Sequence, residues 1–264
     1  MSDSLSLYRE LFSSYTPLNT NKTLLNSYRK ITNDYNNVSN IRSKINSVIA
    51  KNYLNETVIK SSFIKRHLSK RSPRLNITIF ELNANKSRAD LCVINGESFV
   101  YEIKTEYDNY DRLEKQLNDY QAFFDYLYVI VPKTEINEIK KYIADDVGII
   151  LYKQNRLGNI VFDRYKKALL NKKTVPEMQL SSLTKKTLLD LNNEKNNYSL
   201  SKEYLIDKLL VKYTQKEINN IYRETTKKKY YHRWNFLHKD LENIYMLDYQ
   251  WFFKNNINYK KVYR

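Results

Sequence analysis

Residues 88–120 read RADLCVINGESFVYEIKTEYDNYDRLEKQLNDY, and this stretch decides the predicted fold. It holds one strand pattern that carries Asp90, a turn at Asn95 and Gly96, and a second strand pattern that ends in Glu-Ile-Lys at 102–104. The first is the pattern of a buried strand, and the Asn-Gly pair between the two patterns is a hairpin-turn signal. The stretch therefore predicts a β-hairpin, and an amphipathic helix is expected to follow it over about residues 109–124.

Further strand patterns flank this hairpin. Residues 75–82 (LNITIFEL) alternate, whereas YLYVIV at 126–131 is almost continuously apolar, as expected of a strand covered on both faces by helices. Helical spacing is expected at 134–144, and strands are expected at 147–153 and 159–165, the last as an edge strand. Together these elements predict an α/β fold with a mixed central β-sheet flanked by helices.

The flanks read as helices. Residues 4–35 contain helical fragments that predict a loosely packed arm over residues 1–38, and another helix is expected from Asn55 to Leu68. Thr214 and Glu217 form a capping box that opens a helix at 215–226. The spacing from the preceding helix also allows a helix-turn-helix, although two ordinary packed helices are the simpler interpretation. We expect a basic, all-helical C-terminal domain at 169–264 and the sheet domain at 39–168.

Charge is distributed unevenly along the 264 residues, whose formal net charge is +16. Residues 1–80 hold 13 basic and 4 acidic side chains, residues 81–163 hold 10 and 15, and residues 164–264 hold 22 and 10. A codon bias could raise the total, but it does not predict an acidic centre between basic flanks. This distribution favours a polyanionic partner held over an acidic site.

Several classes of site and location are excluded or disfavoured by composition. One cysteine, Cys92, allows no internal disulfide, and three scattered histidines provide no zinc-ligand spacing. The longest apolar run is too short to cross a bilayer, and MSDSLSLYRELF lacks the layout of a signal peptide. A cytoplasmic protein without membrane contact is expected.

The hairpin carries the residues expected to do chemistry. Asp90 and Glu102 supply the hard oxygen ligands that Mg²⁺ or Mn²⁺ prefers, and the backbone carbonyl of Ile103 could add another. Lys104 lies two residues after Glu102, on the same strand face, where its ammonium can orient a water molecule or stabilise charge. This set predicts a divalent-metal site that acts on phosphate groups.

The register of the hairpin tests this set. A two-residue Asn-Gly turn would pair Ile94 with Glu97, and Asp90 and Glu102 would then lie on opposite faces. A shared site requires a shift by one residue, so we predict a three-residue loop or a bulge at Gly96.

These residues resemble a known family. Asp90 followed by Glu102-x-Lys104 resembles the core motif of the PD-(D/E)xK, or restriction-endonuclease-like, nuclease superfamily, and Gln116-x-x-x-Tyr120 is similar to the QxxxY motif of its RecB-like branch. Ala89 stands where the nominal motif has Pro. The resemblance covers residues 56–132, and RADL, YEIK and DRLEKQ also resemble small, uncharacterised bacterial members.

The resemblance implies specific roles. Asp90, Glu102 and Ile103 would bind the metal, and Glu56, on the first helix of the fold, would complete the site. Lys104 would assist the attacking water, and Gln116 and Tyr120 would steady Lys104 or the phosphate. The residues expected to contact nucleic acid are Arg88, Arg112, Lys227, Lys228, Lys229 and Arg233.

The function expected on this basis is a metal-dependent nuclease with DNA as the expected substrate, in bacterial defence against mobile DNA or in DNA processing. The alternatives are a catalytically silent module that binds nucleic acid or regulates, and a toxin-type RNase. The sequence leaves the oligomeric state open, with a dimer among the possibilities.

Overall fold

The computed structural model describes residues 2–36 and 38–263. Six strands form one sheet in the order β1-β2-β3-β4-β5-β6. β1 to β3 and the β5–β6 pair are antiparallel, while β3–β4 and β4–β5 are parallel. The strands are β1 Ile77–Ala84, β2 Ser87–Asn95, β3 Glu97–Ile103, β4 Tyr126–Pro132, β5 Gly148–Gln154 and β6 Ile160–Lys166. The predicted α/β class with a mixed sheet is confirmed.

The expected fully buried strand is β4. Its residues are buried except for Tyr126, which is half-buried, because β4 lies between β3 and β5 and helices cover the sheet. At one edge, β6 keeps exposed polar residues, as expected of an edge strand. The helices before and within the sheet region are α1 Ser2–Ser14, α2 Asn21–Thr32, α3 Ile41–Asn52, α4 Glu56–Phe63, α5 Leu113–Gln121 and α6 Ile136–Ile139.

The N-terminal helices are packed rather than loose, which corrects the expected arm. Leu11, Leu24 and Ile45 are buried between α1, α2 and α3. Arg42 is also buried, and its guanidinium donates to the carbonyl of Pro17 at 3.1 Å. These contacts tie the connections between the helices to the bundle.

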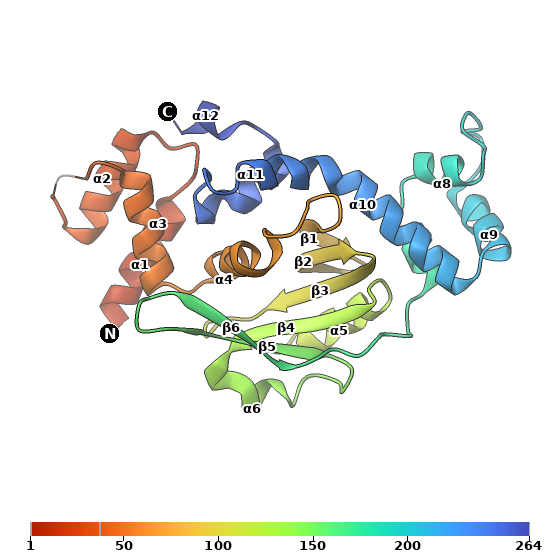
Figure 1. Cartoon of the computed structure of the whole chain (residues 1–264), viewed down its shortest axis with the longest axis horizontal. Helices are drawn as coiled ribbons and strands as arrows, with labels where there is room; N and C mark the ends of the chain where they lie inside the picture. The colour runs from red at the N-terminus through yellow and green to blue at the C-terminus, as the bar shows by residue number, and fades with distance from the viewer. Residues whose placement is uncertain (1, 37, 264) are drawn as a thin grey trace.

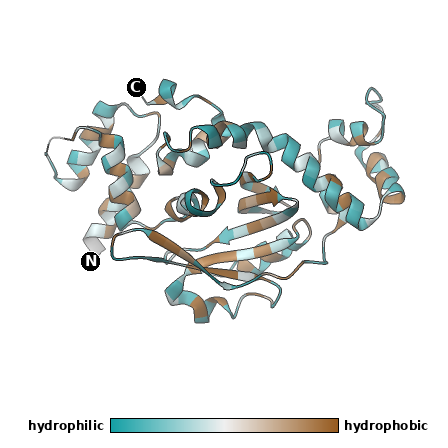
Figure 2. Cartoon of the chain, in the orientation of Figure 1, coloured by the Kyte–Doolittle hydropathy of each residue, from teal (hydrophilic) through white to brown (hydrophobic). Residues whose placement is uncertain are grey.

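The C-terminal region is helical, as expected, but its main helix is longer than predicted. The helices are α7 Pro176–Ser181, α8 Lys185–Leu191, α9 Lys202–Lys212, α10 Gln215–Lys239, α11 Tyr249–Asn255 and α12 Tyr259–Val262. The capping box of Thr214 and Glu217 is present. α10 crosses above the sheet beside β1, and much of its surface is hydrophilic (Figures 1 and 2).

Buried apolar side chains connect the sheet to this region. Phe80 of β1 lies 5.0 Å from Phe253 of α11, and Phe123 lies 5.8 Å from Tyr222 of α10, between ring centroids. The division into residues 1–38, 39–168 and 169–264 stays a prediction, and residues 1, 37 and 264 of those ranges lie outside the described part. Among the described residues, no helix combines the length and apolar character needed to cross a membrane.

Candidate functional site

Three carboxylates lie in one row across three neighbouring strands. Pairing of Phe80 with Leu91 and of Leu82 with Ala89 places Glu81 opposite Asp90. On the other side of β2, Leu91 pairs with Tyr101, so the next position places Asp90 opposite Glu102. The ladder is interrupted here, and a carboxylate oxygen of Asp90 instead accepts a hydrogen bond from the amide of Ile103 at 2.7 Å.

The hairpin register that this row requires is confirmed. Asn95 pairs with Glu97 around Gly96, whose φ is +71°, and Ile94 pairs with Ser98. This pairing is shifted by one residue from a plain two-residue turn, as predicted. Because side chains alternate along a strand, the shift brings Asp90 and Glu102 to the same face.

The backbone at Glu81 is unusual. Its φ is +54°, a left-handed conformation that costs a non-glycine residue about 1–2 kcal/mol. Two cations hold its carboxylate, since Lys60 Nζ lies 2.5 Å and Arg88 Nε 2.6 Å from its oxygens. Strain of this kind persists where surrounding contacts determine the conformation, and it is common at functional sites.

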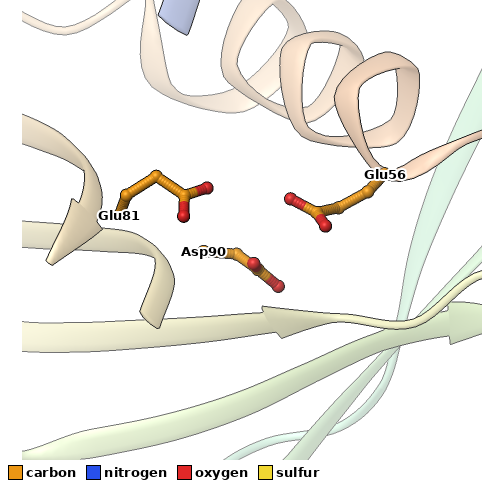
Figure 3. Close-up of side chains that lie close together, drawn as sticks. All are labelled: Glu56, Glu81 and Asp90. Atoms are coloured by element: carbon orange, nitrogen blue, oxygen red, sulfur yellow. The ribbon is translucent and has the colours of Figure 1, made fainter. Parts of the chain in front are cut away.

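Helix α4 contributes an acidic and a basic side chain, Glu56 and Lys60, to the site formed by Glu81 and Asp90. The side chain of Asn55 caps the helix by accepting from the amide of Val58, which sets Glu56 in the first turn. Lys60 follows one turn later, 1% exposed, with Nζ 2.6 Å from Glu56 and 3.9 Å from Asp90. Carboxylate oxygens of Glu56, Glu81 and Asp90 all lie within 4.8 Å of one another and converge on one space (Figure 3).

Burial and mutual repulsion dominate the electrostatics of this cluster. Burial raises the pKa of Asp90 well above its usual range, and the charges of Glu102 and Glu56 raise it further. Burial would lower the pKa of Lys60, but the carboxylates of Asp90, Glu56 and Glu81 outweigh it and the net pKa is raised. The cluster therefore favours a cation at its centre.

A second network surrounds Glu102. Lys104 Nζ donates to Glu102 at 3.0 Å and to the side-chain oxygen of Gln116 at 2.9 Å. The amide of Gln116 donates to the same Glu102 oxygen at 2.6 Å, and the hydroxyl of Tyr120 donates to its other oxygen at 2.7 Å. Gln116 therefore contacts Lys104 as the resemblance implied, while Tyr120 contacts Glu102.

These groups line one open, polar cavity of about 730 Å³. Asp90, Glu102 and Ile103 form part of its wall with Lys104 and Gln116. Besides Lys104, the basic side chains that line the cavity are Lys86, Arg88, Arg112 and Lys115. Such a cavity suits an anionic ligand that reaches the carboxylates through a bound cation.

The residues expected to contact nucleic acid divide into two groups. Arg88 and Arg112 line this cavity. Lys227, Lys228, Lys229 and Arg233 lie on α10, and two of them, Lys228 and Lys229, line a separate cavity of about 850 Å³ whose wall also includes Glu81.

Sequence reasoning missed Lys60 and assigned no role to Glu81. The available signal for Lys60 was its spacing, because a residue four positions after Glu56 lies on the same helix face. For Glu81 the signal was its position opposite Asp90, which becomes visible once the β1–β2 register is known.

Comparisons with known proteins identify a family. The model of the family described as bacteriophage P4 protein cII matches residues 49–248. Protein cII of Enterobacteria phage P4 is 29% identical over 107 residues, which cover 40% of this chain and only 40% of the phage protein. A solved structure of a protein of unknown function from Silicibacter pomeroyi is 16% identical over 39% of this chain and 66% of that one, with a TM-score of 0.30. At that TM-score the likeness carries no argument.

The family match overturns the resemblance to the PD-(D/E)xK superfamily and its RecB-like branch. That resemblance rested on a few motif residues, whereas the family match extends over residues 49–248 and gives no nuclease activity. The expected nuclease, its setting in phage defence or DNA processing, and the alternatives of a silent module of that superfamily and a toxin-type RNase are therefore wrong. The chain belongs to the bacteriophage P4 protein cII family.

Proposed function

We propose that the carboxylate cluster binds one divalent cation, Mg²⁺ or Mn²⁺. The observation that carries this proposal is the convergence of Glu56, Glu81 and Asp90, whose oxygens lie within 4.8 Å of one another. Carboxylate oxygens are the ligands that hard divalent cations prefer. Glu102 lies beside Asp90 in the strand row, and Ile103 lines the same cavity, so both can contribute at its edge.

The partner proposed for this cation is a phosphate group of nucleic acid, with DNA as the expected form. A net charge of +16 attracts polyanions, and five basic side chains line the cavity. The carboxylates of the cavity would repel phosphate in the absence of a cation, because like charges at such distances repel strongly. Cation and nucleic acid should therefore bind cooperatively. We propose a cytoplasmic location, where both a divalent cation and nucleic acid are present.

Lys104 would contribute to phosphate binding in the same cavity. Glu102 and Gln116 hold its ammonium at the cavity wall, where it can donate hydrogen bonds to an anionic phosphate oxygen.

Calorimetric titration with Mn²⁺ and Mg²⁺ tests the cation site. The wild type should bind one ion, and Asp90→Asn should weaken binding at least tenfold, since it removes a charged ligand. Asp163→Asn, on the exposed surface of β6, is the matched control and should bind as the wild type does. Equal affinity of the two variants would overturn the site.

Fluorescence anisotropy with labelled DNA and RNA oligonucleotides tests the partner. Binding should strengthen on addition of Mg²⁺, weaken with EDTA, and weaken in Arg112→Ala. If neither EDTA nor Arg112→Ala changed the affinity for the oligonucleotides, the cavity would be rejected as the nucleic-acid site.

A further inference from the structure

The centre of the carboxylate cluster holds a cation that belongs to the chain itself. Lys60 Nζ lies 2.6 Å from Glu56, 2.5 Å from Glu81 and 3.9 Å from Asp90. These are the same three carboxylates whose oxygens converge within 4.8 Å of one another. The ammonium and a divalent cation would therefore use the same oxygens.

Lys60 also stabilises the carboxylate cluster when no divalent ion is bound. A buried ammonium is costly unless anionic partners surround it, and three carboxylates in close contact repel one another unless a cation lies between them. Lys60 is 1% exposed and Asp90 is 8% exposed, so water cannot perform this neutralisation alone. The ion pairs between Lys60 and the carboxylates therefore offset both the cost of burying the ammonium and the repulsion among the carboxylates.

A further hydrogen-bond acceptor lies beside the Lys60 ammonium and could hold it if a divalent ion displaced it from the carboxylates. The side-chain oxygen of Gln250, on α11, lies 3.3 Å from Lys60 Nζ and lines the cavity. Glu56 is the most solvent-accessible of the three carboxylates, with a side chain 48% exposed. The ammonium can thus shift toward Gln250 while a divalent ion enters the cluster from the solvent-exposed side, at Glu56.

We propose that Lys60 is a resident counter-cation that a divalent ion must displace. Lys60 then keeps the cluster folded in the absence of metal and sets the affinity for metal by competing with it. This inference rests on the proposed cation site and adds a residue that determines how tightly, and at what ion concentration, that site fills.

The test compares wild type, Lys60→Met and Lys65→Met by Mn²⁺ calorimetry and by thermal unfolding with and without Mn²⁺. Lys65 lies on the next turn with a side chain 52% exposed, so it controls for the general loss of a positive charge. Lys60→Met should bind Mn²⁺ at least tenfold more tightly than wild type, and Lys65→Met should match the wild type. Without Mn²⁺, Lys60→Met should unfold at a lower temperature, and Mn²⁺ should restore it.

Each outcome decides between the proposals. Equal affinity in wild type and Lys60→Met overturns the displacement and leaves the cation site intact, whereas no Mn²⁺ binding in either rejects the site and the inference together. A Lys60→Met variant that folds only with Mn²⁺ supports the inference, and one that folds under neither condition contradicts it. Lys60→Arg, which keeps a cation in the cluster, should bind Mn²⁺ no more tightly than wild type.

Discussion

The hydroxyl of Tyr120 donates a hydrogen bond to Oε2 of Glu102 at 2.7 Å, so a residue of α5 fixes the orientation of a carboxylate on β3. Burial raises the pKa of Glu102, and this hydrogen bond is one of the contacts that oppose the rise. Both groups are buried, and the bond joins the strand row to the helix that also carries Gln116.

Tyr120→Phe should therefore destabilise the protein at neutral pH. A hydrogen bond to a charged group contributes about 1.5–3 kcal/mol, and the variant leaves a buried carboxylate oxygen without this donor. Urea unfolding at pH 7 measures the loss. Tyr35→Phe, at a position 69% exposed, is the control and should be close to neutral. Equal losses in the two variants would show that the bond does not stabilise Glu102.

A buried ion pair holds α10 against the sheet region. Asp125 accepts from the amide of Ser98 at 2.7 Å, from Asn219 at 2.7 Å and from Arg223 at 3.0 Å. The side chains of Asp125 and Arg223 are 5% and 16% exposed. This pair connects the loop before β4 with the long C-terminal helix.

Arg223→Leu should cost about 3–5 kcal/mol of unfolding free energy, because it leaves the buried charge of Asp125 without its cationic partner. Chemical denaturation measures this cost. Arg233→Leu, on an exposed position of the same helix, should cost less than about 1 kcal/mol. A small effect of Arg223→Leu would mean that α10 is not anchored by this pair.

The hairpin and the sheet could be predicted because they follow from local patterns. Strand alternation fixes which residues share a face, and an Asn-Gly turn limits the possible registers to a few. The requirement that Asp90 and Glu102 meet then selected one register, and the pairing of Ile94 with Ser98 confirms it. The alternation of side chains along the two strands was therefore enough to predict the register of the hairpin.

The features that could not be predicted depend on contacts between distant segments. Lys60 looks like any lysine on a helix until α4 is placed against the sheet, where its ammonium reaches Glu81 and Asp90. Helix α10 was expected to end near Thr226. It continues to Lys239 because Trp234 and Leu237 are buried against the rest of the molecule.

The glycine at the hairpin turn differs from the glycine that opens β5. Gly96 has a φ of +71° and open space around an added Cβ, whereas a Cβ at Gly148 would lie 2.3 Å from the ring of Tyr128 and 2.7 Å from the amide nitrogen of Ala168. Gly96→Ala should cost about 1–2 kcal/mol through backbone strain alone. Gly148→Ala should cost more, because both the ring and the backbone must move.

Thermal or chemical unfolding of the two alanine variants tests this order. Gly96→Asn is the matched variant at the turn, and it should be milder than Gly96→Ala, since Asn tolerates positive φ better. If Gly148→Ala were the milder of the two alanine variants, the close packing of β5 against Tyr128 would be wrong.

One carboxyl far from the candidate site should control the pH dependence of stability. Asp248 is fully buried and accepts hydrogen bonds from Tyr15 at 2.9 Å and Tyr263 at 2.6 Å, which joins the residue after α1 to the C-terminal segment. Burial raises the pKa of Asp248 from 3.8 to about 6, although both tyrosine hydroxyls act to lower it. The native state therefore holds this proton more tightly than the unfolded state does.

The sign of the effect follows from that difference. The stabilisation from protonated Asp248 is complete below pH 3.8 and is lost as pH rises to about 6, and a shift of this size corresponds to about 3 kcal/mol. Asp248→Asn cannot titrate, so its unfolding free energy should gain about 3 kcal/mol relative to wild type between pH 3 and pH 7. Denaturant unfolding of both proteins at each pH measures the difference. Asp34→Asn should change in the opposite direction, because hydrogen bonds from Asn36 and Tyr28 lower the pKa of Asp34. Parallel pH curves for wild type and Asp248→Asn would contradict a raised pKa at this position.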